Sequence, residues 1–504
     1  MPPPLLSGLG SGVVARMRSS GSFCFQLIRR VVHVRDERQH PWLELVYRKL
    51  IGRFRHVSHH TVHGIVTARW YDFRMFRFVL PLALALPLAA QSHQAVVVIS
   101  VDGMRPDYVL KADEHGLKIP HLRRLMKDGA YATGARGVLP TVTYPSHTTI
   151  LTGAWPVKHH IYSNVVFDPL DRNLAGWMWY AEDIAVPTLW EAASKAGMVV
   201  GSVSWPVSVA ARGIAYDIPE YWRASKFPGE DLKLLRAIST PGLVAGIEKD
   251  AGPYITDLDE AEKGDRQRTR YAVWILRNKH AQFMTVHLAS LDHLEHAHGP
   301  FSPEANATLE QIDAEVGELE AAAPNAIVCV LSDHGFTRTE HSFNIVSAFV
   351  EEGLVTMTNK KVTSWKAFPD IEGGSAAIIL KDESERAQVA KLLARLAADP
   401  KNGIAQILEP RQIAAFGGRP DAAFWVDMQS NFSVLPIDRA DKVGGTHGYA
   451  PSNPQLLAAF FIAGSKIKPG VNLGEIDMRS IAATLARAME ISFPSADLPA
   501  LPVF

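Results

Sequence analysis

Cysteine is nearly absent from this chain, since only Cys24 and Cys329 occur among its 504 residues. Two thiols cannot form a disulfide framework of several bridges or a zinc site built from cysteines. Cys329 also lies inside the apolar run Ala326–Leu331, which is typical of a buried strand. Any metal that this chain binds must therefore be held by Asp, His and other oxygen donors.

The chain also lacks net charge, because 52 Lys and Arg residues balance 52 Asp and Glu residues. The charges are unevenly spread, with 13 basic against 4 acidic residues in 1–90 and 39 against 48 in 91–504. A slightly acidic body gives stable nucleic-acid binding no electrostatic support. An apolar content of 47% with 21% charged residues is typical of a folded protein.

Long hydrophobic runs are missing except for one short run near the N-terminus. Met75–Gln91 has a basic start, an apolar core of about a dozen residues and small residues before Gln91, the pattern of a secretory signal peptide. It is too short to span a bilayer comfortably. We therefore predict a signal peptide at 75–90, a secreted or periplasmic protein without a membrane anchor, and a mis-assigned or disordered leader at 1–74. The alternative is a cytosolic protein with a basic tail.

From residue 95 onward, apolar runs alternate with helix-like stretches. This alternation predicts a layered α/β fold over residues 91–504. The expected strands are Ala95–Val101, Met198–Ser204, Phe283–Leu288, Ile327–Leu331 and Leu457–Ile462. The expected helices are Pro120–Lys127, Val186–Ala196, Ser302–Ala322, Glu385–Ala397 and Ile476–Ala488.

Two stretches interrupt this alternation. Residues 207–275 carry aromatic residues, prolines and charges without a clear strand. Residues 340–445 contain a compact αβ pattern around Ala376–Leu380, which predicts a small inserted subdomain or cap. Insertions of this kind usually shape substrate specificity.

Residues that bind metal well are scattered over the whole body of the chain. Several of them follow a short apolar run or precede a glycine, where a doubly wound α/β protein exposes side chains at its strand ends. In Ser290–Gly299 two of them are four residues apart, which places both on one face of a helical turn. His293, Glu295 and His298 are rival ligands in that segment. The expected ligands are Asp102, Asp292, His296, Asp333, His334 and His447.

A hydroxyl-rich segment, Leu139–His147, lies between the first of these ligands and the others. Its Thr143 is a candidate nucleophile. A metal centre beside a hydroxyl nucleophile favours phosphoryl chemistry.

The ordered set of motifs Asp-Gly, Thr-x-Thr-aromatic-Pro, Asp-x-x-x-His, Asp-His-Gly and Gly-x-His-Gly resembles the nucleotide pyrophosphatase/phosphodiesterase family of the alkaline phosphatase superfamily. The resemblance covers roughly residues 95–490. It implies an alkaline-phosphatase-like α/β fold in which a central, mostly parallel sheet is flanked by helices and two zinc ions lie at the strand ends. A secreted phosphodiesterase or nucleotide pyrophosphatase that works through a phosphorylated threonine is the expected function.

The resemblance also implies which residues would bind each zinc ion and which would act on the substrate. One zinc would take Asp292, His296 and His447, and the other would take Asp102, Asp333, His334 and the hydroxyl of Thr143. The nucleophile would be Thr143 and not Thr141. Asn164 matches the family asparagine that donates to a phosphoryl oxygen, and the alternative for it is a turn residue. Tyr144 and Trp205 are aromatic substrate contacts by the same comparison, although such rings are more often core.

The formal charges of this ligand set agree with a phosphodiester substrate. Three carboxylates and three neutral imidazoles with two Zn²⁺ leave the centre near +1, and ionisation of Thr143 brings it to zero. A bound divalent ion lowers the pKa of a hydroxyl by many units, which makes an alkoxide available near neutral pH. A diester monoanion would be attracted to such a site without being trapped.

The substrate class is less defined by the sequence. Monoesterases similar to this family carry Lys-x-Arg where this chain has Val203–Val209, and the family lysine before the nucleophile is replaced by Val142. The missing cations favour a diester or pyrophosphate over a monoester dianion. A phosphomonoesterase, a phosphonate hydrolase and a lipid head-group diesterase stay open, as does a non-catalytic, metal-stabilised envelope binding protein. Phosphoglycerate mutases use a serine nucleophile, and sulfatases need a Cys/Ser-x-Pro-x-Arg motif, so neither fits.

Overall fold

The computed structural model describes residues 93–172, 176–221, 228–256, 261–435 and 443–504. The predicted leader and signal peptide, residues 1–90, lie outside the described residues. Among the described helices, none is both long and apolar enough to cross a membrane.

The largest sheet has eight strands, of which β7, β1, β6, β4 and β5 run parallel to one another. One strand, β18, runs antiparallel to both of its neighbours. The mostly parallel sheet predicted from the sequence is confirmed. In order across the sheet, the strands are β19 (Val471–Asn472), β2 (Ala130–Tyr131), β18 (Phe460–Ala463), β7 (Ile327–Leu331), β1 (Val96–Val101), β6 (Phe283–Leu288), β4 (Val200–Val203) and β5 (Tyr216–Ile218).

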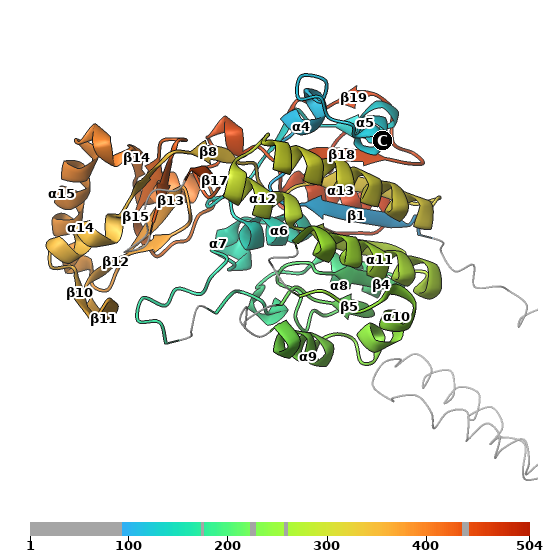
Figure 1. Cartoon of the computed structure of the whole chain (residues 1–504), viewed down its shortest axis with the longest axis horizontal. Coiled ribbons are helices and arrows are strands. Elements are labelled where there is room, and N and C mark those ends of the chain that lie inside the picture. The colour runs from blue at the N-terminus through green and yellow to red at the C-terminus, as the bar shows by residue number, and fades with distance from the viewer. Residues whose placement is uncertain (1–92, 173–175, 222–227, 257–260, 436–442) are drawn as a thin grey trace, which may run out of the picture. The chain divides into compact units, whose positions relative to one another are not determined.

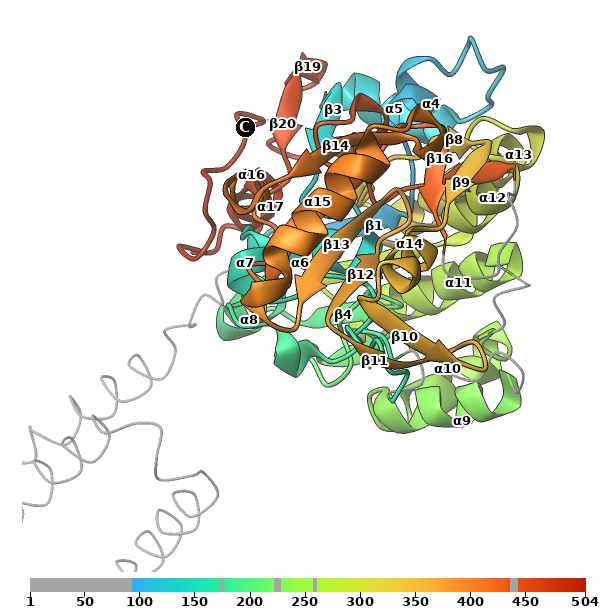
Figure 2. The same ribbon diagram turned by 90° about the vertical axis from the view of Figure 1, so that its left-hand side faces the viewer.

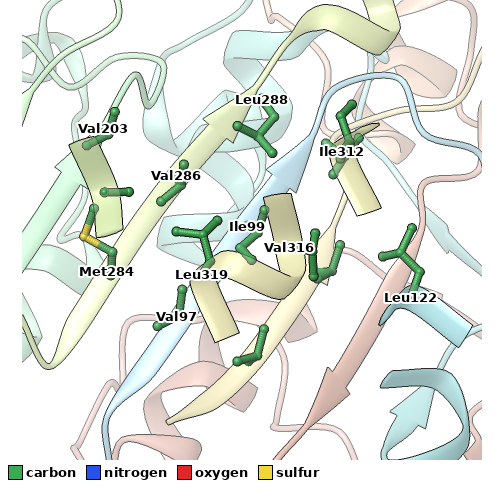
Figure 3. Close-up of a cluster of buried hydrophobic side chains, with 14 of the residues drawn as sticks. Val97, Ile99, Leu122, Val203, Met284, Val286, Leu288, Ile312, Val316 and Leu319 are labelled. Carbon is green, nitrogen blue, oxygen red and sulfur yellow. The ribbon is translucent and has the colours of Figure 1, made fainter. Parts of the chain in front are cut away.

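Helices cover both faces of this sheet (Figure 1). Successive residues of a strand point to opposite faces, so Val97 and Ile99 of β1 join one core while Val96 and Val98 join the other. This two-sided burial explains why the strands read as continuous apolar runs. Figure 3 shows part of the first core, where Leu122 and Ile312 pack near the strands. The helices on this face are α5 (Pro120–Asp128), α9 (Pro228–Ile238), α10 (Leu243–Ala251), α11 (Ala261–Lys279) and α13 (Pro303–Ala322). On the second pack α6 (Thr143–Thr152), α8 (Leu189–Lys195) and α17 (Ser480–Ala488).

The predicted helix starts differ from the observed ones where a cap or a strand intervenes. Helix α8 begins after Thr188, because that side chain and Glu191 form a capping box. Helix α17 begins only at Ser480, because the preceding residues form β20 (Glu475–Asp477), which pairs with β3 (Gly134–Arg136). The strands and helices expected in the regular part of the chain are otherwise present.

Residues 207–275 are more regular than the sequence pattern indicates. Besides β5 they contain the helices α9, α10 and α11, so the expectation of a segment without a clear strand is wrong. Helix α11 buries Tyr271, Ala272 and Ile275 against the sheet while its other faces carry many charges. That high charge content hides its periodicity from inspection.

Residues 340–445 contain a second, antiparallel sheet, drawn in orange in Figure 2. Helices α14 (Ile345–Glu351) and α15 (Arg386–Ala397) close one hydrophobic core against it. Its other face, with Ala377 and Trp425, packs with Leu139 and Ala450 beside the site segments. In order, the strands are β12 (Ala367–Ile371), β13 (Ser375–Leu380), β15 (Ala422–Met428) and β14 (Ile404–Leu408).

The remaining elements are short. Two-stranded pairs are formed by β10 (Val355–Thr358) with β11 (Lys361–Trp365), β9 (His341–Phe343) with β16 (Phe432–Val434), and β8 (Thr337–Thr339) with β17 (Gly444–Thr446). The other helices are α4 (Asp107–Leu110), α7 (Pro156–His159), α12 (Ser290–His298) and α16 (Pro410–Ala415).

Candidate metal centre and nucleophile

Three of the predicted ligands lie at the carboxyl ends of neighbouring parallel strands. Asp102 directly follows β1, and Asp333 and His334 follow β7, which pairs with β1. Gly103 adopts φ 74°, a left-handed conformation that glycine reaches without steric cost, and its amide donates to Asp333 Oδ1 at 3.2 Å. The tight turn after β1 therefore ties two of these ligands together.

Helix α12 carries the next two predicted ligands, Asp292 and His296, one turn apart, as their spacing predicts. The start of this helix is fixed by Asp265 of α11, whose carboxylate accepts from the amides of Ala289 and Ser290 at 3.0 and 2.8 Å. A buried acid at a helix N-terminus satisfies otherwise unpaired amides. Helix α11 thus holds the ligand helix in place.

His447 reaches the same region through a close backbone approach. It follows β17, which pairs with β8. A Cβ on Gly444 would lie 2.4 Å from the carbonyl oxygen of His296, and one on Gly445 would lie 2.7 Å from that of Glu295. The two glycines let this strand lie directly against α12, which brings His447 to Asp292.

The six predicted ligands form two groups of three, in each of which the ligand atoms lie within 4.8 Å of one another. In the buried group, His334 Nε2 lies 3.3 Å from Asp102 Oδ1 and 3.2 Å from Asp333 Oδ2. In the outer group, Asp292 lies 3.5 Å from His296 Nε2 and 3.6 Å from His447 Nε2. Ligands about 2.0–2.1 Å from a tetrahedral ion are roughly 3.3 Å apart, so both groups fit a zinc-sized ion.

The three histidines are oriented in the same way. Each Nδ1 faces a backbone carbonyl: Gly445 for His296 at 3.1 Å, Gly335 for His334 at 3.2 Å, and Thr141 for His447 at 3.1 Å. When Nδ1–H donates to such a carbonyl, the unprotonated Nε2 is left for a metal. Burial lowers the pKa of His334 to about 3, so this imidazole is neutral, as a ligand must be.

Each of the three candidate carboxylate ligands has one oxygen that no residue described by the structure stabilises by a hydrogen bond. Asp102 Oδ1, Asp292 Oδ1 and Asp333 Oδ2 are buried oxygens without a hydrogen-bond partner. Burial raises the pKa of Asp102 well above its usual value, and the negative charges of Asp333 and Asp292 raise it further. Burial likewise raises the pKa of Asp292. Unpaired buried carboxylates are costly, and a bound cation removes that cost.

The two groups are adjacent. The rings of His334 and His447, one from each group, stack with centroids 3.8 Å apart and an angle of 11° between their planes. The charge of Asp333 also raises the pKa of Asp292 across the groups. The six candidate ligands therefore lie in two neighbouring groups at one place in the fold.

Thr143 lies beside the buried group. It is the first residue of α6, and its Oγ1 is 3.5 Å from His334 Nε2. Asn164 Nδ2 lies 3.5 Å from the same Oγ1, while Asn164 Oδ1 accepts from the amide of Tyr144 at 2.8 Å. The amide of Asn164 is thus held with its donor toward the hydroxyl.

Among the predicted rival ligands, His293 and His298 are exposed and belong to neither group. Glu295 is buried and accepts from the hydroxyl of Tyr108 at 2.7 Å. It belongs to neither group of three, which favours Asp292 and His296 as the ligands from α12.

The two aromatic residues predicted as substrate contacts lie in the core. Tyr144 and Trp205 each have an exposed fraction of 0%. The hydroxyl of Tyr144 points inward and donates to Glu220 Oε1 at 2.8 Å. Neither ring offers a face to a substrate, so this part of the predicted site does not fit the structure.

Three buried residues that the sequence motifs did not indicate lie next to the predicted ligands. His287 Nε2 is 3.0 Å from Asp102 Oδ2, and its Nδ1 is 2.7 Å from Glu220 Oε2. Although burial acts to lower it, the two carboxylates raise the pKa of His287 well above its ordinary value. His147 Nδ1 lies 2.8 Å from the carbonyl of Thr143. A polar residue near the end of an apolar strand, as His287 is in β6, was the available signal.

Residues 96–449 match the sequence family described as type I phosphodiesterase / nucleotide pyrophosphatase. The chain belongs to this family. Type I phosphodiesterases and nucleotide pyrophosphatases are hydrolases, and the metal-ligand groups described above agree with a metal-dependent family.

Individual relatives are distant. The chain is 27% identical over 255 residues to human ectonucleotide pyrophosphatase/phosphodiesterase family member 1, which covers 47% of this chain and 23% of that protein. It is 25% identical over 282 residues to human family member 5, covering 53% of this chain and 50% of that protein. The chain thus spans only about a quarter to a half of these relatives.

Solved structures agree with the fold. Murine ectonucleotide pyrophosphatase/phosphodiesterase 5 matches with a TM-score of 0.57 over 81% of this chain and 97% of the murine chain, at 18% identity. An inactive form of the same murine protein in complex with AMP matches with the same score and identity. These type I phosphodiesterase relatives support the alkaline-phosphatase-like α/β architecture expected from the motifs.

Proposed function

We propose that this chain is a two-zinc phosphodiesterase or nucleotide pyrophosphatase whose nucleophile is Thr143. The observation that carries the proposal is the pair of adjoining three-ligand groups, one of which lies beside the hydroxyl of Thr143, 3.5 Å from the ligand atom of His334. Asp102, Asp333 and His334 would hold one ion beside Thr143. Asp292, His296 and His447 would hold the other.

Zinc fits the donors better than harder cations do. The sites offer imidazole nitrogens and carboxylates in threes, which leaves a position open for a substrate or hydroxyl oxygen. When bound, the pair of ions lowers the pKa of a hydroxyl and stabilises negative charge on the attacking and leaving oxygens.

The residues of the chain then position the reaction. Thr143 Oγ attacks phosphorus, a P–O bond forms, and the bond from phosphorus to the leaving alcohol or phosphate breaks. Asn164 Nδ2, which lies on the Oγ side of Thr143, donates to a phosphoryl oxygen. Water then attacks the phosphothreonine, which releases the phosphoryl product and regenerates Thr143.

A diester or pyrophosphate is the proposed substrate class. Residues 203–209 carry no Lys or Arg and are buried, so they supply no cation for the second charge of a monoester. AMP in complex with the murine relative supports a nucleotide as one of the two groups. A phosphomonoesterase or phosphonate hydrolase is the alternative that a substrate screen would reveal.

Replacement of the nucleophile tests the mechanism. T143A should lower kcat for a nucleotide p-nitrophenyl ester by at least about 10⁴-fold while the zinc content stays at two per chain, because the nucleophile is lost and the six ligands remain. T141A is the matched control, since that hydroxyl donates to the carbonyl of Tyr449 at 2.9 Å and not toward the centre.

Two results would reject the mechanism. One is full diesterase activity in T143A, and the other is an equal loss in T141A. Wild-type kcat/KM for the nucleotide ester or bis-p-nitrophenyl phosphate should also exceed that for p-nitrophenyl phosphate. The reverse ranking would make the protein a monoesterase.

Export is part of the proposal. The basic and apolar pattern of residues 75–90 supports cleavage before Gln91. N-terminal sequencing of the protein recovered outside the cytoplasm should begin near Gln91. A mature chain that begins near Met1 would contradict it.

A further inference from the structure

Glu220 is a buried acid on the loop after β5, and both of its carboxylate oxygens are used. Oε2 lies 2.7 Å from His287 Nδ1, and Oε1 accepts from the hydroxyl of Tyr144 at 2.8 Å. The exposed fraction of Glu220 is 6%. One side chain from the segment that follows β5 thus connects β6 with α6.

We call the two contacts of Glu220 its arms. The first arm, through His287, leads to the candidate metal ligand Asp102. His287 lies between two carboxylates, with Nε2 within hydrogen-bond distance of Asp102 Oδ2, at 3.0 Å, and Nδ1 2.7 Å from Glu220 Oε2. This hydrogen bond occupies Oδ2 and leaves Asp102 Oδ1 directed at His334, 3.3 Å away.

The second arm leads to the nucleophile. Tyr144 follows Thr143 in α6, its ring is fully buried, and its amide donates to Asn164 Oδ1. Fixing the phenol therefore fixes the first turn of α6, where both the hydroxyl of Thr143 and the contact with Asn164 originate. A shift of about 1 Å in a reacting group can cost about 100-fold in rate.

We propose that Glu220 is a positioning residue that fixes the positions of Asp102 and Thr143 relative to each other. It acts on Asp102 through His287 and on Thr143 through Tyr144. The inference rests on the proposed function for its kinetic part only, because its effect on metal binding is measurable without a substrate. Hydrogen-bond partners behind a metal ligand typically change metal affinity or activity by 10–100-fold.

Asp217 provides a matched control for a general effect of burial. It lies in β5, three residues before Glu220, and is also a buried acid, with an exposed fraction of 7%. Burial raises its pKa well above the usual value, and its Oδ1 has no hydrogen-bond partner. D217N makes the same carboxylate-to-amide change in the same segment without touching His287 or Tyr144.

The test is zinc titration of apo-protein against a competing chelator for the wild type, E220Q and D217N. We expect E220Q to weaken one of the two zinc sites by about 10–100-fold and to leave the other within about threefold. D217N should leave both sites within about threefold. With a nucleotide p-nitrophenyl ester, E220Q should lower kcat while KM stays within about threefold. If E220Q does not fold, H287Q breaks the same arm.

Y144F separates the arms. It keeps the ring but removes the donor to Glu220, so both zinc affinities should stay within about threefold while kcat falls about 5–50-fold. Unchanged zinc affinity in E220Q, or equal weakening in D217N, would overturn the proposal. Unaltered kcat in Y144F would overturn its second arm. Failure of the wild type to hydrolyse any ester would defeat the proposed function and leave the zinc result as the test of the first arm.

Discussion

The two ligand groups differ in how they are built. The side chains of Asp102, Asp333 and His334 are at most 6% exposed, and all three follow strands in the middle of the large sheet. In the outer group, the side chain of His296 is 43% exposed and that of Asp292 is 18% exposed, and both stand on a nine-residue helix. One group is therefore part of the core, and the other lies at its edge.

Under the proposed mechanism, this difference would give the two ions separate tasks. The buried group, whose side chains are packed in the core, would suit the activation of Thr143, which lies next to it. An outer group exchanges ligands and water more readily, so it suits the leaving oxygen and the incoming water. We expect the outer ion to bind more weakly and to leave first.

The largest effect should follow from breaking the buried group. D333N removes one of its two carboxylates, so zinc content should fall to about one per chain and kcat by more than about 100-fold, which exceeds the usual cost of a lost supporting hydrogen bond. Metal analysis after gel filtration and steady-state kinetics measure both. Excess zinc should not restore activity. Two retained ions with near-normal kcat would remove the buried group from the mechanism.

A smaller effect is expected in the outer group. H296A removes a half-exposed ligand, and water can take its place, so the loss of kcat/KM should be at least about tenfold smaller than in D333N. Millimolar zinc should recover much of it, since mass action refills a weakened site. Activity against zinc concentration for both variants gives the comparison. A loss in H296A that zinc cannot reverse would erase the distinction between the groups.

The smallest effect is expected at Glu315, a buried acid that belongs to neither ligand group. Burial in α13 raises the pKa of Glu315 to about 8, so the folded protein holds a proton there that the unfolded chain releases above about 4.5. The free energy of unfolding that depends on this proton is fully present below about pH 4.5 and is lost as the pH rises toward 8.

Urea unfolding of the wild type and E315Q at pH 5 and pH 8.5 measures this loss. E315Q should gain free energy of unfolding relative to the wild type at the higher pH, by a few kcal/mol at most, because one pKa unit corresponds to about 1.4 kcal/mol. An identical difference at both pH values would mean that Glu315 ionises normally.

Local pattern sufficed to identify the candidate ligands that the structure brings together and to predict the main sheet. Asp102 and Asp333 follow apolar strands and precede a glycine or histidine, and this arrangement is readable without coordinates. Asp292 and His296 are readable from a helical interval. In each case the structure at the residue is determined by neighbours within a few positions.

Partners across the fold were not readable. Glu220 meets His287 and Tyr144 only because β5, β6 and α6 pack together, and no spacing along the chain encodes that. The same tertiary packing turned Tyr144 and Trp205 inward, against the expectation that they contact substrate. In α11, frequent charged residues masked a face that packs on the sheet, so the helix was missed.

The chain order of the ligands has a consequence for biogenesis. Asp102 comes near the start of the described body, and His447 arrives only after the antiparallel sheet of residues 367–428 has been made. Under the proposed two-ion assignment, the complete outer group can therefore form only after both sheets have been synthesised. Zinc loading would then report maturation, and truncations before residue 447 should retain at most a single bound ion.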